Sequence, residues 1–321
     1  MTKIDLITGT LGAGKTTFLR RYAQYLLRSG QRIAILENDF GAVNIDIMML
    51  QDLKSENCKL ETVSGCGDPH CHRRRLRTQL IALGMQHFDR VLMEPSGIFD
   101  MDEFFDTLFE PPLDRWFEIG SVLTVVDAHA QETGTEQAEY LFASEAAYAG
   151  KLIVSKLEPE DDPDAVSRRI LDHLRGAGEA IRLDRQFHAN DLLLCDWDSF
   201  TDSDFSTLMN AGYRHANYVK QFRMENIGSN VHYFMRFRFP AEQTAQIVQE
   251  IFASGGKIRR IKGALPTADG WCKINATAEK TETERVPEAQ AVLIVIGDAV
   301  DRAAIDRIMQ QYNTDPDYVS I

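Results

Sequence analysis

The sequence contains little cysteine, and its few cysteines are unevenly placed. Five of the 321 residues are cysteines, an odd number, and two of them, Cys66 and Cys71, lie close together. A disulfide scaffold needs a denser and even set, so this usage favours a reducing compartment with free thiols. We therefore expect a cytoplasmic protein in which the two neighbouring cysteines are available as ligands.

Long apolar runs and an excess of positive charge are also lacking. No segment approaches the roughly 20 apolar residues of a membrane span, and the apolar run of the first ten residues (MTKIDLITGT) is broken by Asp5. The chain has 35 Lys and Arg against 48 Asp and Glu, which gives a formal net charge of −13. Such a charge repels phosphate backbones and anionic lipids. We expect neither nucleic acid nor a membrane as a partner.

The length suits two domains, a larger one followed by a smaller one. Through the first half, short apolar runs alternate with helical periodicity, which predicts an α/β fold with a doubly wound, mostly parallel sheet. After about residue 186 the pattern becomes irregular, and a polar stretch leads into the alternating segment 231–240. We expect a first domain over 1–205, and a linker with a small α+β domain over 206–321. Residues 281–285 are interpreted as a solvated hairpin tip.

The elements expected in the first half are short. The expected strands cover 3–8, 32–38, 59–64, 90–96, 121–128 and 151–156, and the expected helices cover 15–28, 73–83, 136–148 and 163–175.

The strongest motif follows the first expected strand. Residues 9–16, GTLGAGKT, match G-x4-G-K-[ST] and open an expected helix. In such a loop the backbone N–H groups cradle phosphate, Lys15 reaches the β and γ oxygens, and the Thr16 hydroxyl ligates Mg²⁺. Residues 10–11 are Thr-Leu, so the loop lacks the additional lysine of ATPases that partition plasmids or target membranes. The loop positions expected to bind the nucleotide are Gly9, Gly12, Ala13, Gly14, Lys15 and Thr16.

A second group of candidates follows the strand RVLMEPS. Glu94 stands where Mg²⁺ or its water would lie, and the N–H of Gly97 is placed to meet the γ-phosphate. A strand that merely ends in a Pro-Ser-Gly turn is the alternative.

The strand KLIVSK leads to a candidate base-reading motif, Ser155-Lys156-Leu-Glu158. A carboxylate two residues after a lysine is how GTPases read guanine, because it accepts from N1–H and from the 2-amino group. The usual tetrapeptide is Asn-Lys-x-Asp, so the chain departs from it twice. Ser155 still donates a hydrogen bond, and Glu158 keeps the carboxylate fork with one more methylene. We expect GTP, with relaxed base selectivity as the alternative.

The motifs GTLGAGKTT, LENDFGAVNID, GC…C, MEPSG, VVDA, VSKLE and IRRIKG…VLIVIG resemble, in this order, those of the CobW-type metallochaperone GTPases. The resemblance runs over nearly the whole chain. It implies a metal-responsive GTPase domain, a smaller C-terminal domain, and the delivery or allocation of a transition metal to a client metalloprotein. By position, Thr17 joins the phosphate loop, residues 37–41 match the first switch segment, and Glu94 and Gly97 match the second. Asp39 stands where the family usually has Glu before Phe-Gly.

The stretch SGCGDPHCH, residues 64–72, departs from the family's Gly-Cys-x-Cys-Cys signature. One thiol is missing and two imidazoles have been gained. Thiolate with imidazole suits Zn²⁺ and also Co²⁺ or Ni²⁺. Since adjacent residues rarely all bind one ion, we expect the two cysteines, one histidine and a carboxylate from the neighbouring strand end; the alternative is a turn that holds no metal. The candidate ligands are Cys66, His70, Cys71, His72 and Glu37.

These motifs together favour a slow GTPase switch whose metal stretch lies between two nucleotide-sensing segments. Lys15 and Mg²⁺ would stabilise charge, Glu94 would act beside the Mg²⁺, and Asp39 or Glu37 would position the attacking water. A small-molecule P-loop kinase is a second hypothesis, although residues 131–148 lack the arginine that a lid over the phosphates would need. A non-catalytic adaptor that binds nucleotide or metal is the third. The sequence names neither the client, the metal nor the oligomeric state.

Overall fold

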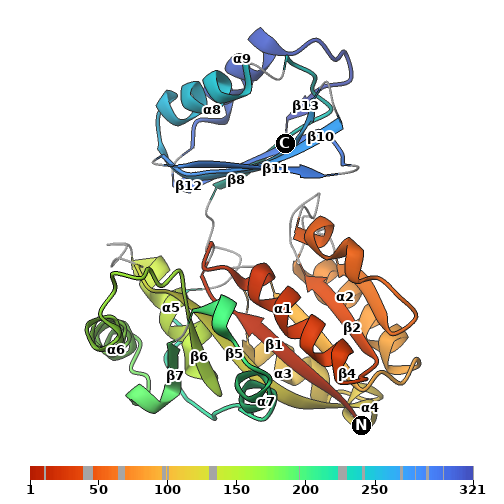
Figure 1. Ribbon diagram of the computed structural model, residues 1–321, viewed down its shortest axis with the longest axis vertical. Coiled ribbons are helices and arrows are strands. Elements are labelled where there is room, and N and C mark those ends of the chain that lie inside the picture. The colour runs from red at the N-terminus through yellow and green to blue at the C-terminus, as the bar shows by residue number, and fades with distance from the viewer. Residues whose placement is uncertain are drawn as a thin grey trace. The chain divides into compact units, whose positions relative to one another are not determined.

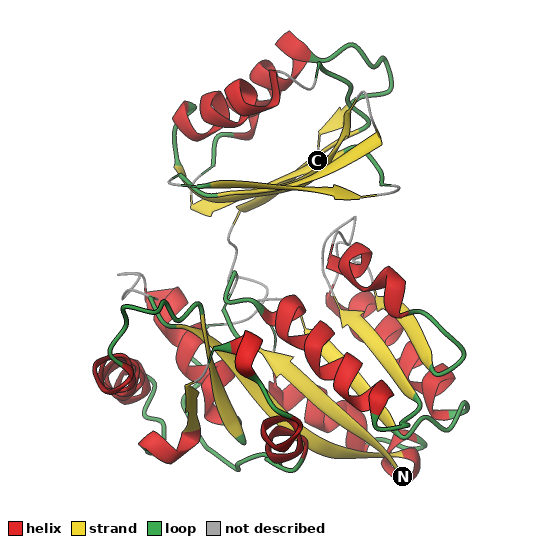
Figure 2. Ribbon diagram, in the orientation of Figure 1, coloured by secondary structure: helices red, strands yellow, loops and turns green. Residues whose placement is uncertain are grey.

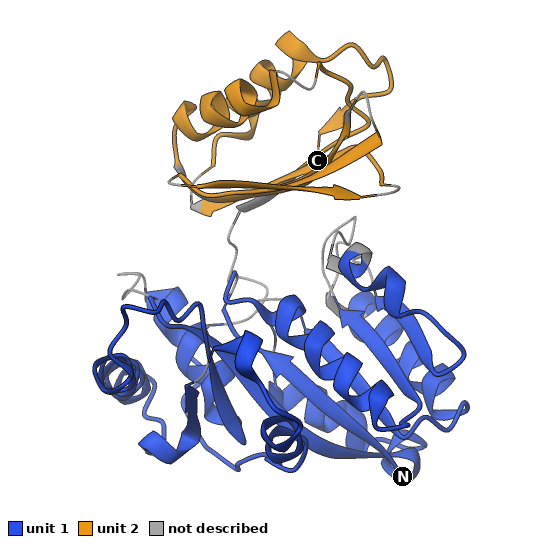
Figure 3. Ribbon diagram, in the orientation of Figure 1, with its two compact units in different colours: residues 1–227 blue, residues 228–321 orange. Residues whose placement is uncertain are grey.

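The chain forms two compact units, residues 1–227 and 228–321 (Figure 3). No helix among the parts of the chain described below is long and apolar enough to cross a membrane. The computed structural model describes residues 1–10, 12–38, 46–63, 69–95, 99, 101–129, 136–194, 196–222, 230–240, 243–267, 270–278, 280–286, 289–298 and 300–320.

The first unit contains a seven-stranded sheet with the order β3-β2-β4-β1-β5-β6-β7, in which all paired neighbours run parallel. This arrangement confirms the expected fold class (Figure 1). The strands are β1 (Thr2–Thr8), β2 (Ile33–Asn38), β3 (Cys58–Val63), β4 (Arg90–Pro95), β5 (Phe117–Asp127), β6 (Lys151–Ser155) and β7 (Leu192–Leu194).

Helices cover both faces of this sheet, as Figure 2 shows. Strand β1 illustrates the reason: Ile4 and Leu6 pack with α2 and α3 on one face, whereas Ile7 packs with α1 and α7 on the other. Strands β2 and β4 are buried at every position, as expected for central strands of a parallel sheet. The helices are α1 (Lys15–Arg28), α2 (Pro69–Gly84), α3 (Met101–Phe109), α4 (Leu113–Trp116), α5 (Glu136–Ala147), α6 (Pro163–Ala180) and α7 (Asp202–Met209), with 3-10 turns η1 (Asp46–Leu53), η2 (Ala189–Asp191) and η3 (Trp197–Ser199).

The boundary between the units lies after Ile227, later than the expected boundary after residue 205. Tyr213 forms a β-bridge with Ala149, and the backbone N–H of Val219 donates to Ile181 O at 2.8 Å. These contacts are made by the backbone, so the polar side chains of this stretch do not reveal them. The polar composition therefore indicated a linker where the chain still packs on the first unit.

The second unit is a six-stranded antiparallel sheet, ordered β11-β10-β9-β12-β8-β13, with two helices. Its core joins Ile261 and Val295 of the sheet to Ile247 and Ile305 of the helices. The expected α+β domain is thus present. Its elements are β8 (Asn230–Met235), α8 (Thr244–Ala253), β9 (Lys257–Thr267), β10 (Gly270–Ala276), β11 (Thr281–Val286), β12 (Val292–Asp298), α9 (Arg302–Tyr312) and β13 (Val319–Ser320).

Residues 281–285 are strand rather than the expected hairpin tip. They belong to β11, which pairs with β10 from Thr281 to Val286. Charged, exposed side chains are typical of edge strands because they discourage further pairing. That charge made the segment resemble a solvated turn.

A buried ionic network ties the centre of the first sheet together. Asp5 on β1 is fully buried, and Nη1 of Arg90 on β4 lies 2.5 Å and 2.6 Å from its two carboxylate oxygens. The same carboxylate accepts from the backbone N–H of Ser121 on β5 at 2.7 Å and from the Tyr22 hydroxyl on α1 at 2.8 Å. Three strands and one helix therefore meet at a single charged group.

We predict that Asp5→Ala lowers the free energy of unfolding of the first unit by about 3–5 kcal/mol, because it leaves the guanidinium of Arg90 buried without its counter-ion. Tyr22→Phe, which removes one of the donors to the same carboxylate, serves as the control and should cost about 1–2 kcal/mol. Urea unfolding followed by circular dichroism measures both. An Asp5→Ala protein no less stable than Tyr22→Phe would contradict a structural role for the ion pair.

Candidate functional site

The loop between β1 and α1 is held in a glycine-dependent conformation. Gly9, Gly12 and Gly14 have φ angles of 129°, 85° and 102°, which side-chain-bearing residues rarely adopt. A Cβ atom on Gly9 would also lie 2.2 Å from the carbonyl oxygen of Val125 on β5. Both the backbone angle and the packing against β5 thus require glycine at the first position of the loop.

The first turn of α1 carries the two polar side chains of the motif, Lys15 and Thr16, and both are buried. Nζ of Lys15 donates back to the carbonyl oxygens of Gly9 at 2.9 Å and Thr10 at 3.4 Å. The first turn of this 14-residue helix contains no acidic residue. A cation and a helix N-terminus therefore meet at the loop, which is the arrangement that attracts phosphate. Ala13 is buried, and Thr17 is exposed on α1.

Two carboxylates lie at the ends of neighbouring strands beside this helix. Glu37 on β2 and Glu94 on β4 are register partners and are 3% and 7% exposed. The Thr16 hydroxyl donates to Glu94 Oε1 at 3.1 Å. One hydroxyl and two carboxylates are hard oxygen donors, which fit Mg²⁺. Asp39 and Gly97, expected to act here as well, lie outside the described residues.

The motif after β6 is arranged around Asp127, the last residue of β5. Nζ of Lys156 lies 2.5 Å from Asp127 Oδ2, and the backbone of Lys156 adopts a left-handed φ of 57°. The buried Ser155 hydroxyl donates to Val126 O at 3.2 Å, so it fixes β6 against β5. The backbone N–H of Glu158 donates to Asp161 at 2.8 Å, while the residue itself is exposed. This arrangement leaves the Glu158 side chain facing solvent.

The stretch that includes the clustered cysteines is only partly described. Residues 64–68, with Cys66, and the side chain of His70 lie outside the described part. The expected turn ends early, because α2 begins at Pro69 rather than at residue 73. Proline is favoured in the first turn of a helix, where its missing N–H leaves no hydrogen bond unmade. Cys71 and His72 are therefore helical, and Cys71 is disulfide-bonded.

His72 points back toward the sheet. It is 4% exposed, and its Nε2 lies 2.6 Å from Oδ1 of Asn38, the last residue of β2. Because an amide oxygen only accepts, Nε2 carries the hydrogen and Nδ1 carries the lone pair. Burial, and secondarily the charge of Arg75, lowers the pKa of His72. Val63, the last residue of β3, pairs with Asn38, so β2 and β3 end side by side.

Within the described residues, no group of three or more His, Cys, Asp or Glu side chains is placed to hold one metal ion. The expected transition-metal ligands fall largely on residues that are not described, so the proposed site is not tested by this result.

Sequence reasoning missed two residues that contact the phosphate loop. The ring of Trp197, in the turn after β7, lies 3.2 Å from where a Cβ on Gly14 would stand, and its Nε1 donates to Val154 O at 2.9 Å. Glu145 on α5 is 3% exposed, and its carboxylate accepts from the backbone N–H of Gly9. The irregular pattern after residue 186 gave no signal for Trp197. A lone glutamate within the apolar run of α5 (LFASEAAYA) was the available signal for Glu145.

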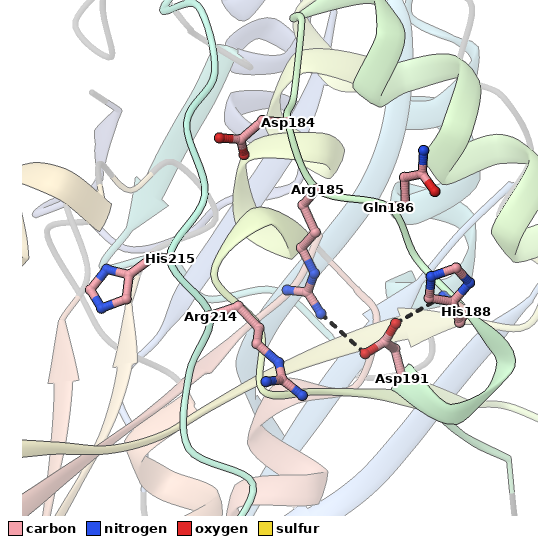
Figure 4. A pocket seen from close by; sticks show the side chains of 7 residues that line it. All are labelled: Asp184, Arg185, Gln186, His188, Asp191, Arg214 and His215. Atoms are coloured by element: carbon pink, nitrogen blue, oxygen red, sulfur yellow. Dashed lines mark hydrogen bonds and ion pairs between the residues drawn. The ribbon is translucent and has the colours of Figure 1, made fainter.

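A hollow of about 380 Å³ lies away from the phosphate loop, near the amino end of β6 (Figure 4). Its most buried cation, Arg185, donates to the carbonyl oxygens of Ala147 at 3.0 Å and Ala149 at 2.6 Å, and it lies 3.4 Å from Asp191 Oδ1. The guanidinium thus caps the C-terminus of α5. The lining residues are Asp184, Arg185, Gln186, His188, Asp191, Arg214 and His215.

Comparison with known proteins identifies the family of the part of the chain that contains this loop. The family model described as CobW/HypB/UreG, nucleotide-binding domain, matches residues 3–181, more than half of the chain. The chain belongs to this family. The matched range includes the phosphate loop, Glu37, Glu94, Glu145 and Glu158, whereas Trp197 and the second unit lie outside it.

Curated relatives are similar over part of their length. The zinc chaperone YjiA of Escherichia coli (strain K12) is 29% identical over 177 residues, 52% of this chain and 53% of that protein. The zinc chaperone CobW of Pseudomonas aeruginosa is 30% identical over 142 residues, 41% of this chain and 37% of that protein. The chain thus spans about half the length, or less, of the curated relatives it matches.

Solved structures give weak overall superpositions. The crystal structure of Zn(II)-bound YjiA GTPase from E. coli has a TM-score of 0.37 and 17% identity, over 98% of this chain and 99% of that chain. The hydrogenase maturation factor HypB from Archaeoglobus fulgidus has a TM-score of 0.34 and 14% identity, over 56% of this chain and 76% of that chain. The description of the fold therefore relies on the strand order and pairing given above.

Proposed function

We propose that the protein is a metal-responsive GTPase of the metallochaperone type, which hydrolyses GTP with Mg²⁺ and binds a transition metal on the stretch 64–72. The observation that carries the proposal is the buried bond from Thr16 to Glu94 at the N-terminus of α1, with Glu37 alongside. Nucleotide-dependent switching needs such a link between the phosphate loop and the ends of neighbouring strands.

In this proposal the phosphate loop binds and orients the triphosphate. Lys15, which donates to loop carbonyls in this structure, moves its hydrogen bonds to the β and γ oxygens. Thr16 and Glu94 hold Mg²⁺, which supplies neutralisation of the phosphate charge when bound. Asp39 positions the attacking water, and the N–H of Gly97 meets the γ-phosphate.

Guanine is read by the residues that follow β6. The ion pair with Asp127 holds the Lys156 stem in place, so that it lies along the base. Glu158 accepts from N1–H and from the 2-amino group of guanine. Its exposure and the anchoring of its backbone on Asp161 support this role.

The transition metal is bound by Cys66, Cys71 and either His70 or His72, with Glu37 as a fourth ligand. The names of the relatives, which are zinc chaperones, favour Zn²⁺, with Co²⁺ and Ni²⁺ as chemically similar alternatives. The bond from His72 to Asn38 fixes the imidazole with its lone pair on Nδ1, the form that ligates metal. A disulfide cannot supply a thiolate, so Cys71 must be reduced before metal binds. The cargo would pass to a client metalloprotein.

The central test is GTP turnover without any added acceptor. Wild-type protein should release phosphate from Mg-GTP, and Lys15→Ala should abolish binding or turnover, because it removes the cation held at the phosphate loop. Lys3→Ala, at an exposed lysine of β1, is the matched control and should behave as wild type. A coupled assay for released phosphate measures the turnover of each protein. Turnover that appears only when a small-molecule acceptor is supplied would instead indicate a kinase.

Base selectivity provides a second prediction. Glu158→Ala should weaken Mg-GTP binding by about tenfold or more and leave Mg-ATP binding nearly unchanged, because guanine alone offers two donors to this carboxylate. Glu160→Ala, a neighbouring exposed carboxylate, is the control. Fluorescence titration with both nucleotides measures the ratio. Equal affinities in wild type, unaffected by Glu158→Ala, would remove the base-reading role.

Metal binding provides a third. The reduced protein should take up one Zn²⁺ per chain, and the double variant Cys66→Ser, Cys71→Ser should not bind it. The double variant should also lose any effect of Zn²⁺ on GTP affinity, because the linkage between metal binding and nucleotide binding is reciprocal. Cys272→Ser, at a free cysteine of the second unit, is the control. Elemental analysis after dialysis gives the stoichiometry. Full metal occupancy in the double variant would place the site elsewhere.

A further inference from the structure

The glutamate that contacts the phosphate loop from α5 has an unusual environment. Glu145 is 3% exposed, and its neighbours on the helix, Ser144, Ala146 and Ala147, are buried as well. One interaction of the carboxylate is with the backbone N–H of Gly9. The other oxygen, Oε2, is buried and has no hydrogen-bond partner within the described residues. If Glu145 is ionised, the hydrogen bond from Gly9 offsets only part of the free-energy cost of burying its charge. A carboxyl group in such a position favours its protonated, neutral form.

Neighbouring elements hold the backbone of α5 in place around this residue. The Thr124 hydroxyl of β5 donates to the backbone oxygen of Glu145 at 3.0 Å, and Thr124 is itself 2.7 Å from the hydroxyl of Thr8 at the end of β1. Arg185 holds the end of the same helix through the carbonyl oxygens of Ala147 and Ala149. The helix, β5 and the loop therefore fix the carboxylate against the first glycine.

The described groups around this carboxylate come from the phosphate loop and from the elements packed against α5. From the loop side Lys15 acts on it, and β1 and β5 bring the hydroxyls of Thr8 and Thr124. On α5 the carboxylate of Glu139 lies toward the N-terminus and is 2.6 Å from His173 of α6. At the other end Arg185 is engaged with helix carbonyls and Asp191. Burial raises the pKa of Glu145 to about 7, although Lys15 and the N–H of Gly9 act in the opposite direction.

We propose that Glu145 is a positioning residue that fixes the first glycine of the phosphate loop and takes up a proton when a nucleotide phosphate binds, so that nucleotide affinity depends on pH. This inference rests on the nucleotide binding proposed above. It names a regulatory coupling within that site.

The direction of the coupling follows from charge. A bound phosphate brings negative charge to the loop and draws Lys15 away from Glu145, and both effects favour the protonated carboxyl over the carboxylate. The proton comes from solvent and binds one carboxylate oxygen, while the other keeps accepting from Gly9. At pH 6 the group is already largely neutral, so binding needs no proton. Above pH 7 binding requires proton uptake, and affinity falls as pH rises.

The test compares three proteins: wild type, Glu145→Gln and Glu139→Gln. Glutamine keeps an oxygen that accepts from Gly9 but does not titrate, and Glu139→Gln makes the same charge change on the same helix away from the loop. Mg-GDP binding is measured by calorimetry from pH 6 to 9, in buffers of different ionisation enthalpy so that protons are counted. Titration of the nucleotide itself is common to all three proteins and cancels in the comparison.

Between pH 6 and 9, wild type and Glu139→Gln should lose about tenfold more affinity than Glu145→Gln, the factor that corresponds to a rise of about one unit in the pKa of Glu145 on binding. They should also take up more protons at pH 8 than Glu145→Gln. Without nucleotide, the Tm of wild type should fall relative to that of Glu145→Gln as pH rises from about 4.5 to about 7 and should level off above that, because over this range the unfolded chain ionises the group while the buried carboxyl keeps its proton.

Identical pH profiles and proton counts for wild type and Glu145→Gln would overturn the inference while leaving the nucleotide site intact. Failure of all three proteins to bind Mg-GDP at any pH would refute the nucleotide site itself, and the inference with it. Loss of binding in Glu145→Gln at all pH values, with wild type unaffected by pH, would show that the carboxylate is needed in its charged form and would also overturn the proposal.

Discussion

The parallel pairing of β1 with β4 on one side and β5 on the other is the constraint on which the candidate site depends. Parallel strands end at the same edge of a sheet, so the groups that follow them converge there whatever their separation in sequence. The phosphate loop follows β1, and Glu94 and Glu37 are register partners at the second-last positions of β4 and β2. Asp5, which joins β1, β4 and β5 through Arg90 and Ser121, holds this part of the sheet together.

A consequence is that carboxylates accumulate around a loop suited to anions. Glu37, Glu94 and Glu145 are all buried close to it, and each would disfavour a bound phosphate if it were left charged. The opposing contributions are Lys15, the N-terminus of α1, and a Mg²⁺ ion on Thr16 and Glu94 in the proposed function. The binding of phosphate and the binding of Mg²⁺ are therefore expected to be coupled. Mg²⁺ offsets the repulsion between the carboxylates and the phosphate, and the phosphate offsets the repulsion between Lys15 and Mg²⁺. Glu145 differs from the other two, since it lies on the α5 side, where a proton rather than Mg²⁺ is proposed to neutralise it.

The early start of α2 determines in which directions the side chains at the end of the cysteine stretch point. With α2 beginning at Pro69, the cysteine and histidine at 71 and 72 are successive helical residues and point in directions about 100° apart. His72 consequently turns toward Asn38 at the end of β2, within the same edge of the sheet as Glu37. The proposed metal site and the proposed switch therefore share a strand end, which gives a short physical route between them.

The sequence by itself determined the fold class, the phosphate loop and the strand ends that carry Glu37, Glu94 and Lys156, because apolar alternation and glycine spacing are local properties of the chain. It did not reveal that the polar stretch after residue 205 pairs with the first unit, because those contacts are made by the backbone, and it did not identify β11, because the charged side chains of an edge strand resemble those of a solvated turn. Only the tertiary structure decided that Glu145 and Trp197 contact the loop and that His72 is buried against Asn38. These contacts join residues from 34 to more than 180 positions apart, and such contacts depend on how the sheet stacks its helices rather than on any neighbouring residue.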